Sequence, residues 1–302
     1  MSSLVIPRTG AEDATAPGST PPGPGRRRRI ALIPTVTLLA GAAYCLLPVL
    51  WVVVASTKSG RELFSTFTFW PGTGFAENLT DLSGYREGVY WRWMANSALY
   101  AGVGALLSTC VSAVSGYALA TYRFRGRETV FNILLAGVLM PPVILAIPQY
   151  LLMAEANLTD SYLSVLLPQI LSPYGVYLAR IYAAAAVPSD VVEAGRMDGA
   201  GEWRIFTRVA LPMMLPGLVT VFLFQFVAVW NNFLLPFIML SDDEKFPITL
   251  GLYTLLEQGS SQPALYTLVI TGAFLAVVPL VALFLVVQRF WSLDLLSGAV
   301  KS

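Results

Sequence analysis

Six long windows of the sequence carry no charged side chain, and these windows decide what the chain can fold into. Each can supply the roughly 20 apolar residues that a helix needs to cross the hydrocarbon core of a bilayer. The windows are residues 30–57, 93–122, 129–154, 161–179, 209–241 and 258–288. Only 12% of all residues are charged, whereas soluble domains carry about 25%. The sequence therefore predicts an all-α, polytopic membrane protein with six transmembrane helices.

Prolines are expected to distort the third and fourth windows in particular. Pro141, Pro142 and Pro148 lie in the third window, and Pro168 and Pro173 lie in the fourth. A proline inside a helix removes a backbone hydrogen bond, so we expect both spans to be kinked. The third span is compatible with a partly unwound helix that lines a cavity, as in transporters, and equally with a bend that serves packing.

The basic residues are distributed unevenly between the two sides of these spans. Placing the N-terminus inside leaves five of the nineteen Lys and Arg residues outside and fourteen inside. This is the asymmetry of the positive-inside rule, so both termini are expected in the cytoplasm. The five outside residues are Lys58, Arg61, Arg86, Arg92 and Lys245.

The segments between the windows give the domain organisation. Residues 1–29 are rich in Pro, Gly, Ser and Thr, which predicts a disordered cytoplasmic tail. Its final run, Arg26 to Arg29, is expected to anchor the topology, with binding of lipid headgroups as the alternative. The remaining predicted parts are the first helix 30–57, an external loop 58–92, a core of five helices 93–289, and a cytoplasmic tail 290–302.

One polar stretch, residues 187–216, separates the fourth window from the fifth. Eight charged residues lie between Arg180 and Arg208, and burying them in lipid would cost on the order of 20 kcal/mol. The stretch must therefore lie outside the membrane. Its pattern predicts one helix that begins with a capping box of Asp190 and Glu193, a break at Gly199, and a second helix over 201–209.

The residues needed for catalysis or for nucleotide binding are missing from the sequence. There is no histidine, the commonest general base and metal ligand. Cys45 and Cys110 lie in apolar runs, where small packing residues are more common than disulfides. No lysine stands in a phosphate-binding loop. No cofactor is expected, and any ATP that drives this protein must bind to another chain. With nineteen basic against eighteen acidic residues, nothing indicates a nucleic-acid partner.

The polar stretch resembles a known motif. Glu193-Ala194-Gly195, two residues, Asp198-Gly199-Ala200 and a later Leu-Pro are similar to the EAA loop of ABC importer permeases. In that family the loop, here 187–212, is a cytoplasmic coupling helix that docks in a cleft of the ATP-hydrolysing subunit. Gly195 replaces the usual Ala, which predicts a softer helix by about 1 kcal/mol. The resemblance implies a coupling role for Glu193, Ala194, Gly195, Asp198, Gly199, Ala200, Phe206 and Pro212.

Further matches narrow the resemblance to carbohydrate importers. The end of the chain resembles the Gly-Ala-Val-Lys tail of the smaller, maltose G type permease, which reaches the interface of the ATPase dimer. That tail corresponds to Gly298, Ala299, Val300 and Lys301. The stretch around Lys58 and the runs 77–79, 96–97, 140–142 and 230–231 also match.

The resemblance carries a set of expectations about structure and partners. It implies a type I ABC importer permease fold in the inner (cytoplasmic) membrane, surrounded by lipid. The implied partners are a second permease subunit, a dimer of ATP-binding subunits and an external sugar-binding protein.

Several polar residues lie within or beside the predicted spans. Gln225, Asn231 and Asn232 in the fifth window are candidates for a substrate pathway, and the alternative is hydrogen bonding between helices. Asn96 and Ser97 open the second window, where capping of the helix is the favoured interpretation.

Taken together, the residues and the resemblance predict a permease subunit that moves a sugar or oligosaccharide, driven by ATP hydrolysis on a separate subunit. The alternative is a self-contained secondary transporter or channel. That class would predict an acidic residue inside a span, and none occurs in the six windows. An enzyme embedded in the membrane would need a nucleophile, base or metal site that this sequence does not supply.

Overall fold

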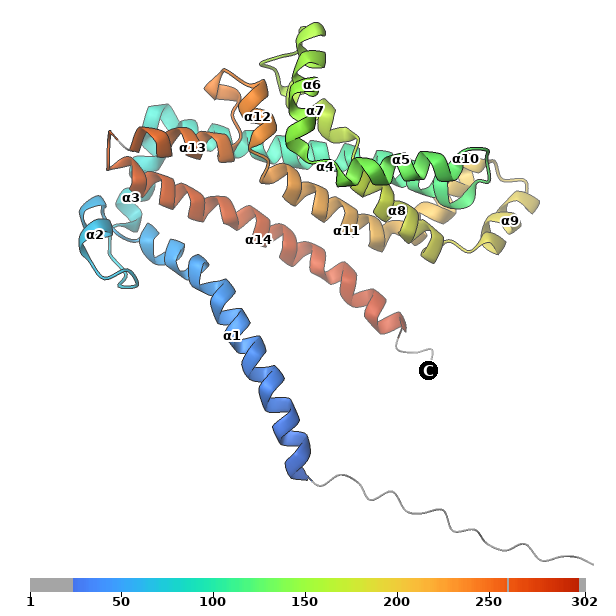
Figure 1. Cartoon of the computed structure of the whole chain (residues 1–302), viewed down its shortest axis with the longest axis horizontal. Helices are drawn as coiled ribbons and strands as arrows, with labels where there is room; N and C mark the ends of the chain where they lie inside the picture. The colour runs from blue at the N-terminus through green and yellow to red at the C-terminus, as the bar shows by residue number, and fades with distance from the viewer. Residues whose placement is uncertain (1–23, 260, 299–302) are drawn as a thin grey trace, which may run out of the picture. The chain divides into compact units, whose positions relative to one another are not determined.

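The computed structural model describes residues 24–259 and 261–298, and every regular element in these ranges is a helix (Figure 1). The predicted all-α fold is therefore confirmed. The chain divides between Leu50 and Trp51 into two compact units. The first contains most of α1, Pro24–Ser56. Residues 1–23 of the predicted N-terminal tail lie outside the described part, and the tail 1–29 stays a prediction.

Four helices in the described ranges are long and apolar enough to cross a membrane. They cover Leu32–Ser56, Phe75–Thr121, Glu202–Trp230 and Leu265–Phe290. The count reaches the predicted six only when each of two bent helix pairs is taken as one span. The predicted prolines explain only the first of these pairs, which breaks beside Pro141 and Pro142. The second pair bends by 75° between Ala186 and Ser189, after the predicted prolines Pro168 and Pro173.

The third window is the clearest of these breaks. Two helices cover it and extend slightly beyond it, α5, Arg127–Leu139, and α6, Pro142–Glu155, and their axes differ by 104°. Figure 1 shows α6 turning away from the direction of α5. In the fourth window α7, Tyr162–Ile170, and α8, Pro173–Ala186, are separated by a two-residue interruption, and the 75° bend comes after α8.

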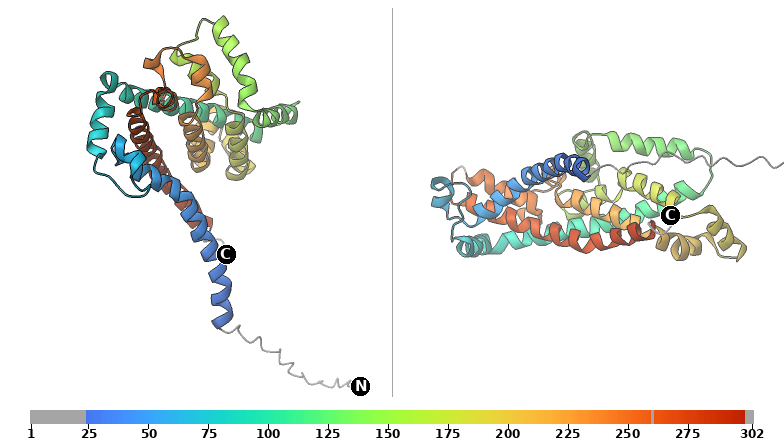
Figure 2. Two further views of the ribbon diagram at one scale, coloured as in Figure 1. Left: turned by 60° about the vertical axis from the view of Figure 1, so that its left-hand side comes forward. Right: turned by 90° about the horizontal axis from the view of Figure 1, so that it is seen from below.

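The core of the second unit is built by α4, Val89–Thr121, α8 and α11, Leu211–Trp230. Small residues allow these helices to approach closely, as is common in membrane bundles. A Cβ on Gly116 would lie 2.6 Å from the Ala179 Cβ, and one on Gly217 would lie 2.3 Å from the Tyr182 ring. Figure 2 shows α4, α11 and α14, Leu265–Gly298, running along one long direction.

Short helices close the two ends of this unit. At one end lie α2, Gly60–Ser65, α3, Phe75–Gly84, and α13, Ile248–Gly259 (Figure 1). At the other end lie α9, Ser189–Met197, and α10, Glu202–Ile205. The remaining elements are η1, Tyr85–Gly88, α12, Leu234–Met239, and η3, Asp243–Lys245.

Asn96 and Ser97 do not cap a helix, because α4 begins seven residues earlier, at Val89. Both side chains are buried and reach a distant segment. The Asn96 amide donates to the carbonyls of Glu244 and Phe246 at 2.8 and 3.0 Å, and the Ser97 hydroxyl accepts from the backbone N–H of Ile248 at 2.7 Å. The capping interpretation was wrong, and the pair holds the segment that leads into α13.

Candidate functional site

The polar stretch folds as two helical pieces around a tight break. Gly199 has a φ of +76°, the left-handed conformation that glycine adopts at little cost. The backbone N–H of Ala200 donates to the carbonyl of Gly195 at 3.0 Å, which closes the C-terminus of α9. The predicted break at Gly199 is confirmed. The predicted capping box of Asp190 and Glu193 is wrong, because the N-cap of α9 is Pro188, whose side chain makes no capping hydrogen bond.

The second helix is not the separate element that the sequence predicted. From α10 the chain passes through a π-helical turn, η2, Phe206–Ala210, directly into α11. Pro212 follows that turn, and its ring would clash with the carbonyl of Arg208 in a regular α-helix, which the wider turn relieves. The polar stretch is thus rigidly joined to the span that starts at Glu202.

One face of the polar stretch is anchored in the helix bundle. Val192, Ile205 and Phe206 are buried in a cluster with Tyr117 and residues of α8. Phe206 packs against the ring of Tyr117 at a centroid distance of 5.2 Å. A Cβ on Gly195 would lie 3.2 Å from Ile205 Cγ1. The departure from Ala at this position therefore has a packing reason that the sequence did not reveal.

A charged contact ties α9 to α10 and to the end of α4. The Arg196 guanidinium donates to the Glu202 carboxylate at 2.7 Å, and the Tyr122 hydroxyl donates to the same carboxylate at 2.8 Å. Burial, together with the hydrogen bond and charge of Glu202, raises the pKa of Tyr122 to about 12. The phenol therefore stays protonated and keeps its donor role across the physiological pH range.

The other face of the polar stretch is open to solvent. Glu193, Ala194, Asp198 and Gly199 are exposed, Gly195 and Ala200 are half-buried, Pro212 is exposed, and Phe206 is buried. Two apolar side chains also project from this face, Met197 at 83% exposure and Trp203 at 68%. The sequence analysis did not assign them a contact role. Their position as large apolar residues in a charged stretch is the signal that could have found them.

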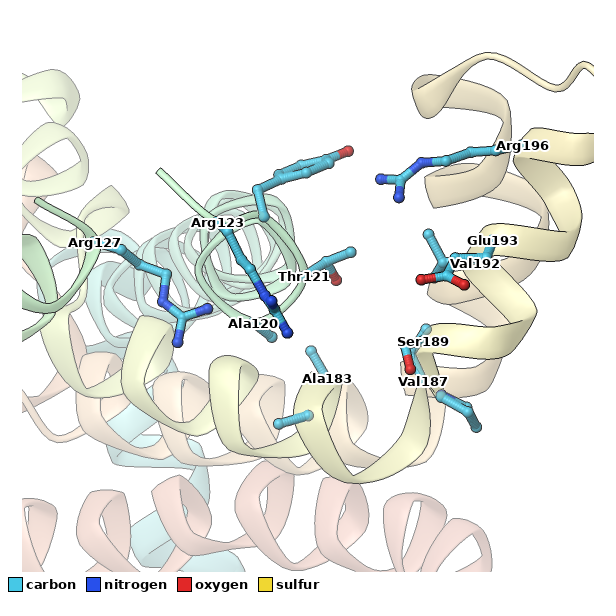
Figure 3. Close-up of a pocket in the computed structure, with 13 residues that line it drawn as sticks. Ala120, Thr121, Arg123, Arg127, Ala183, Val187, Ser189, Val192, Glu193 and Arg196 are labelled. Atoms are coloured by element: carbon cyan, nitrogen blue, oxygen red, sulfur yellow. The ribbon is translucent and has the colours of Figure 1, made fainter. Parts of the chain in front are cut away.

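A polar cavity of about 710 Å³ lies between the end of α4 and α9. Figure 3 shows Arg123 and Arg127 on one side of it and Glu193 and Arg196 on the other. The predicted coupling residue Glu193 therefore faces basic side chains of the turn that follows α4.

The predicted pathway residues lie at the far end of α11, and the structure brings two of the three together. Gln225 and Asn232 line a cavity of about 330 Å³ between α6, α8 and α11. The Gln225 amide donates to the Ser172 hydroxyl at 2.6 Å, so it also bonds between helices. Asn231 is exposed, bonds to the carbonyl of Val227 in its own helix at 2.8 Å, and does not line the cavity.

Comparison with known proteins identifies the family to which this chain belongs. The family described as "Binding-protein-dependent transport system inner membrane component" matches residues 108–293, which include the polar stretch, Gln225 and Asn232, and most of α14. The chain belongs to this family. As a permease subunit of an ABC transporter, it is an integral membrane protein and not itself an enzyme.

Individual relatives match this permease over most of its length. The arabinooligosaccharides transport system permease protein AraQ of Halalkalibacterium halodurans is 35% identical over 84% of this chain and 90% of its own. The lactose transport system permease protein LacG of Rhizobium radiobacter is 30% identical over 91% and 98%. A bacterial ABC transporter involved in the import of alginate superposes with a TM-score of 0.77, at 23% identity over 89% and 99%.

Of the four residues predicted for the C-terminal contact, Gly298 lies within the described residues. Gly298 is the last residue of α14, and the cytoplasmic tail 290–302 stays a prediction. Ala299, Val300 and Lys301 lie beyond the described part.

Proposed function

We propose that this chain is one of two different permease subunits of an importer that moves a sugar or oligosaccharide across the cytoplasmic membrane. The relatives described above transport arabinooligosaccharides and lactose, and they cover this chain almost from end to end. A family that depends on a binding protein also supports a partner that delivers the solute from outside. In this proposal both termini of the chain lie in the cytoplasm.

The polar stretch is the handle through which ATP hydrolysis on a separate subunit dimer moves this permease. The observation that carries the proposal is its two-sided construction, with Val192 and Ile205 buried in the bundle and Met197 and Trp203 exposed. Because α10 continues into α11, a force applied to the exposed face reaches a membrane span directly. Such a chain needs no catalytic group, because a partner's ATP cycle can bias two packings of its helices.

Gln225 and Asn232 are proposed to contact the transported solute. They line one cavity beside the break between α7 and α8, and broken helices commonly supply solute sites in transporters. Asn231 is less suited to this role because it is exposed and lies outside that lining.

The proposal is tested by substituting the exposed face of the handle. Met197→Asp and Trp203→Asp should lose co-purification with the ATPase subunit while the permease remains folded. Val191, at 37% exposure on the same helix, provides a matched control as Val191→Asp. Retained co-purification and full uptake in both test variants would count against the handle, as would labelling of a Glu202→Cys variant from the external side.

A bulky residue at Gly199 provides a second test. Gly199→Trp should leave the subunits assembled but uncouple ATP hydrolysis from uptake, because the turn closes in a left-handed conformation. Normal coupled uptake by this variant would contradict the proposal.

A further inference from the structure

The loop that follows α1 has the reverse of the usual burial pattern of a water-exposed segment, with a charged side chain buried and aromatic side chains exposed. Lys58 is only 2% exposed, whereas Phe64, Phe67 and Trp70 are exposed to 67%, 73% and 70%. Lysine is among the residues least often buried, and large aromatic side chains are normally covered. A loop with a charge inside and three aromatic rings outside is suited to surroundings less polar than bulk water.

Hydrogen bonds fix this inverted arrangement. The Lys58 ammonium donates to the carbonyls of Phe67 at 2.7 Å and Thr68 at 3.3 Å. The Asn78 amide donates to the carbonyls of Ser56 and Lys58 at 2.9 and 2.8 Å. The loop is thereby closed on the end of α1, with the ammonium at its centre.

Within the described residues the Glu62 carboxylate lies near this ammonium, because hydrogen bonds from Ser59 and then the Lys58 charge lower the pKa of Glu62. No carboxylate there lies within 4.0 Å of the Lys58 Nζ. An ammonium has three N–H donors, and the two carbonyl bonds occupy two of them. A buried charge that no carboxylate contacts directly is costly, so an anion from outside the chain that reached the ammonium would stabilise this arrangement.

An apolar groove of about 340 Å³ opens beside Lys58. The rings of Phe64 and Tyr266 meet edge to face across it at 5.9 Å. Apart from Lys58 and Thr68, every side chain that lines the groove is apolar or aromatic. These residues are Trp51, Ala55, Leu63, Phe64, Tyr266 and Ile270.

The groove lies at the level where two membrane spans end. One span ends at Ser56 and another begins at Leu265. Residues of both spans line the groove, together with residues of the loop that follows Ser56. Trp and Tyr are enriched at this level, where the hydrocarbon meets the headgroups. A molecule in the groove would therefore meet apolar walls from acyl-chain depth and an ammonium at headgroup depth.

We propose that this groove binds one phospholipid. Its phosphate pairs with the Lys58 ammonium, and an acyl chain lies against Trp51, Phe64 and Ile270. The site is independent of what the transporter carries. Inorganic phosphate offers the same anion but leaves the apolar walls uncovered, so the structure favours the lipid.

Native mass spectrometry of the complete transporter, purified in detergent with added dioleoyl phosphatidylglycerol, tests the proposal. Lys58→Met removes the cation, and Ile270→Trp fills the groove without touching the hydrogen bonds of Lys58. Val278→Trp, on the same helix at 51% exposure and outside the groove, is the matched control. The wild type and the control should retain one phosphatidylglycerol more per permease, and both test variants should retain it about tenfold less.

Two further probes separate the sources of the anion. Dioleoylglycerol, which lacks a phosphate, should not occupy the site, and inorganic phosphate in large excess should not displace the lipid. Equal lipid retention in all four proteins would overturn the proposal. Retention of dioleoylglycerol would overturn the role of Lys58, and displacement by inorganic phosphate would identify a plain anion site instead. Ile270→Trp keeps the test decisive even where Lys58→Met opens the loop.

Discussion

The break at Gly199 allows a quantitative test of what stabilises the C-terminal turn of α9 in the polar stretch. Gly199 and Gly201 flank the same turn, and a Cβ added at either position would meet no atom within 4 Å. The two glycines differ in backbone conformation, because φ is +76° at Gly199 and −67° at Gly201. Substitution by alanine therefore compares a left-handed position with an ordinary one in matched surroundings.

The expected cost follows from that difference. An L-residue in the left-handed region costs roughly 1–2 kcal/mol relative to glycine. At Gly201 the entropy gain of alanine, about 0.4–1 kcal/mol, offsets its poorer propensity at an N-cap. Gly199→Ala should therefore open α9 roughly five- to thirty-fold more often than Gly201→Ala. Asparagine tolerates the left-handed region better than alanine, so Gly199→Asn should fall between them.

Hydrogen exchange of the complete transporter in lipid nanodiscs measures this opening. The backbone N–H groups of Asp198, Gly199 and Ala200 donate to carbonyls of α9 at 3.0 Å, so they report directly on the last turn of the helix. The ratio of solute imported to ATP hydrolysed should decline in the same order as protection is lost. Equal exchange in Gly199→Ala and Gly201→Ala would refute the role assigned to the backbone conformation.

Three other substitutions probe the remaining sites. Asn96→Ala should destabilise the purified chain by about 1–3 kcal/mol in thermal unfolding, because it leaves two loop carbonyls without their donor. Gln225→Leu should cost only about 0.6 kcal/mol through its lost bond to Ser172, so a much larger fall in uptake would show a contact with solute, and unchanged uptake would exclude one. Burial raises the pKa of Asp160, but backbone N–H donors and Lys245 lower it more, and the net pKa lies below its usual range. Its stabilising effect is thus present above about pH 4 and lost below it, so wild type and Asp160→Asn should differ in melting temperature at neutral pH and converge as the solution is acidified.

The features that the sequence predicted well are those determined locally. Charge-free windows are long enough to cross a bilayer whatever surrounds them, and a charged stretch must leave the lipid wherever it occurs. Gly199 adopts the left-handed conformation that its position after a helix pattern indicates. The number of spans could not be predicted as well. A proline such as Pro142 removes one backbone hydrogen bond, but tertiary packing decides whether the helix then bends slightly or turns by 104°.

Features that depend on distant contacts could not be predicted. Trp93, Asn96 and Tyr100 stand at helical spacing on one face of α4, and all three donate to carbonyls of residues 243–246. The spacing indicates a shared face, but nothing in the sequence names a partner about 150 residues away. Without that partner, capping was the simplest use for an asparagine near the start of a span, and it was wrong.

The bundle has a polar centre around Ser172 and Gln225. A search of the sequence for charged residues within the spans would not find this centre. Ser172 is available to Gln225 because α7 ends three residues before Pro173, where α8 begins, which makes Ser172 the N-cap of α8. A Cβ on Gly175 would lie 2.5 Å from the Ser112 hydroxyl and 3.2 Å from the Gln225 amide, so α4, α8 and α11 all meet at this point. The polar groups come from a helix break and from small residues rather than from charges. A neutral solute that exchanges hydrogen bonds with hydroxyl and amide groups suits this centre better than an ion, which would require a compensating charge.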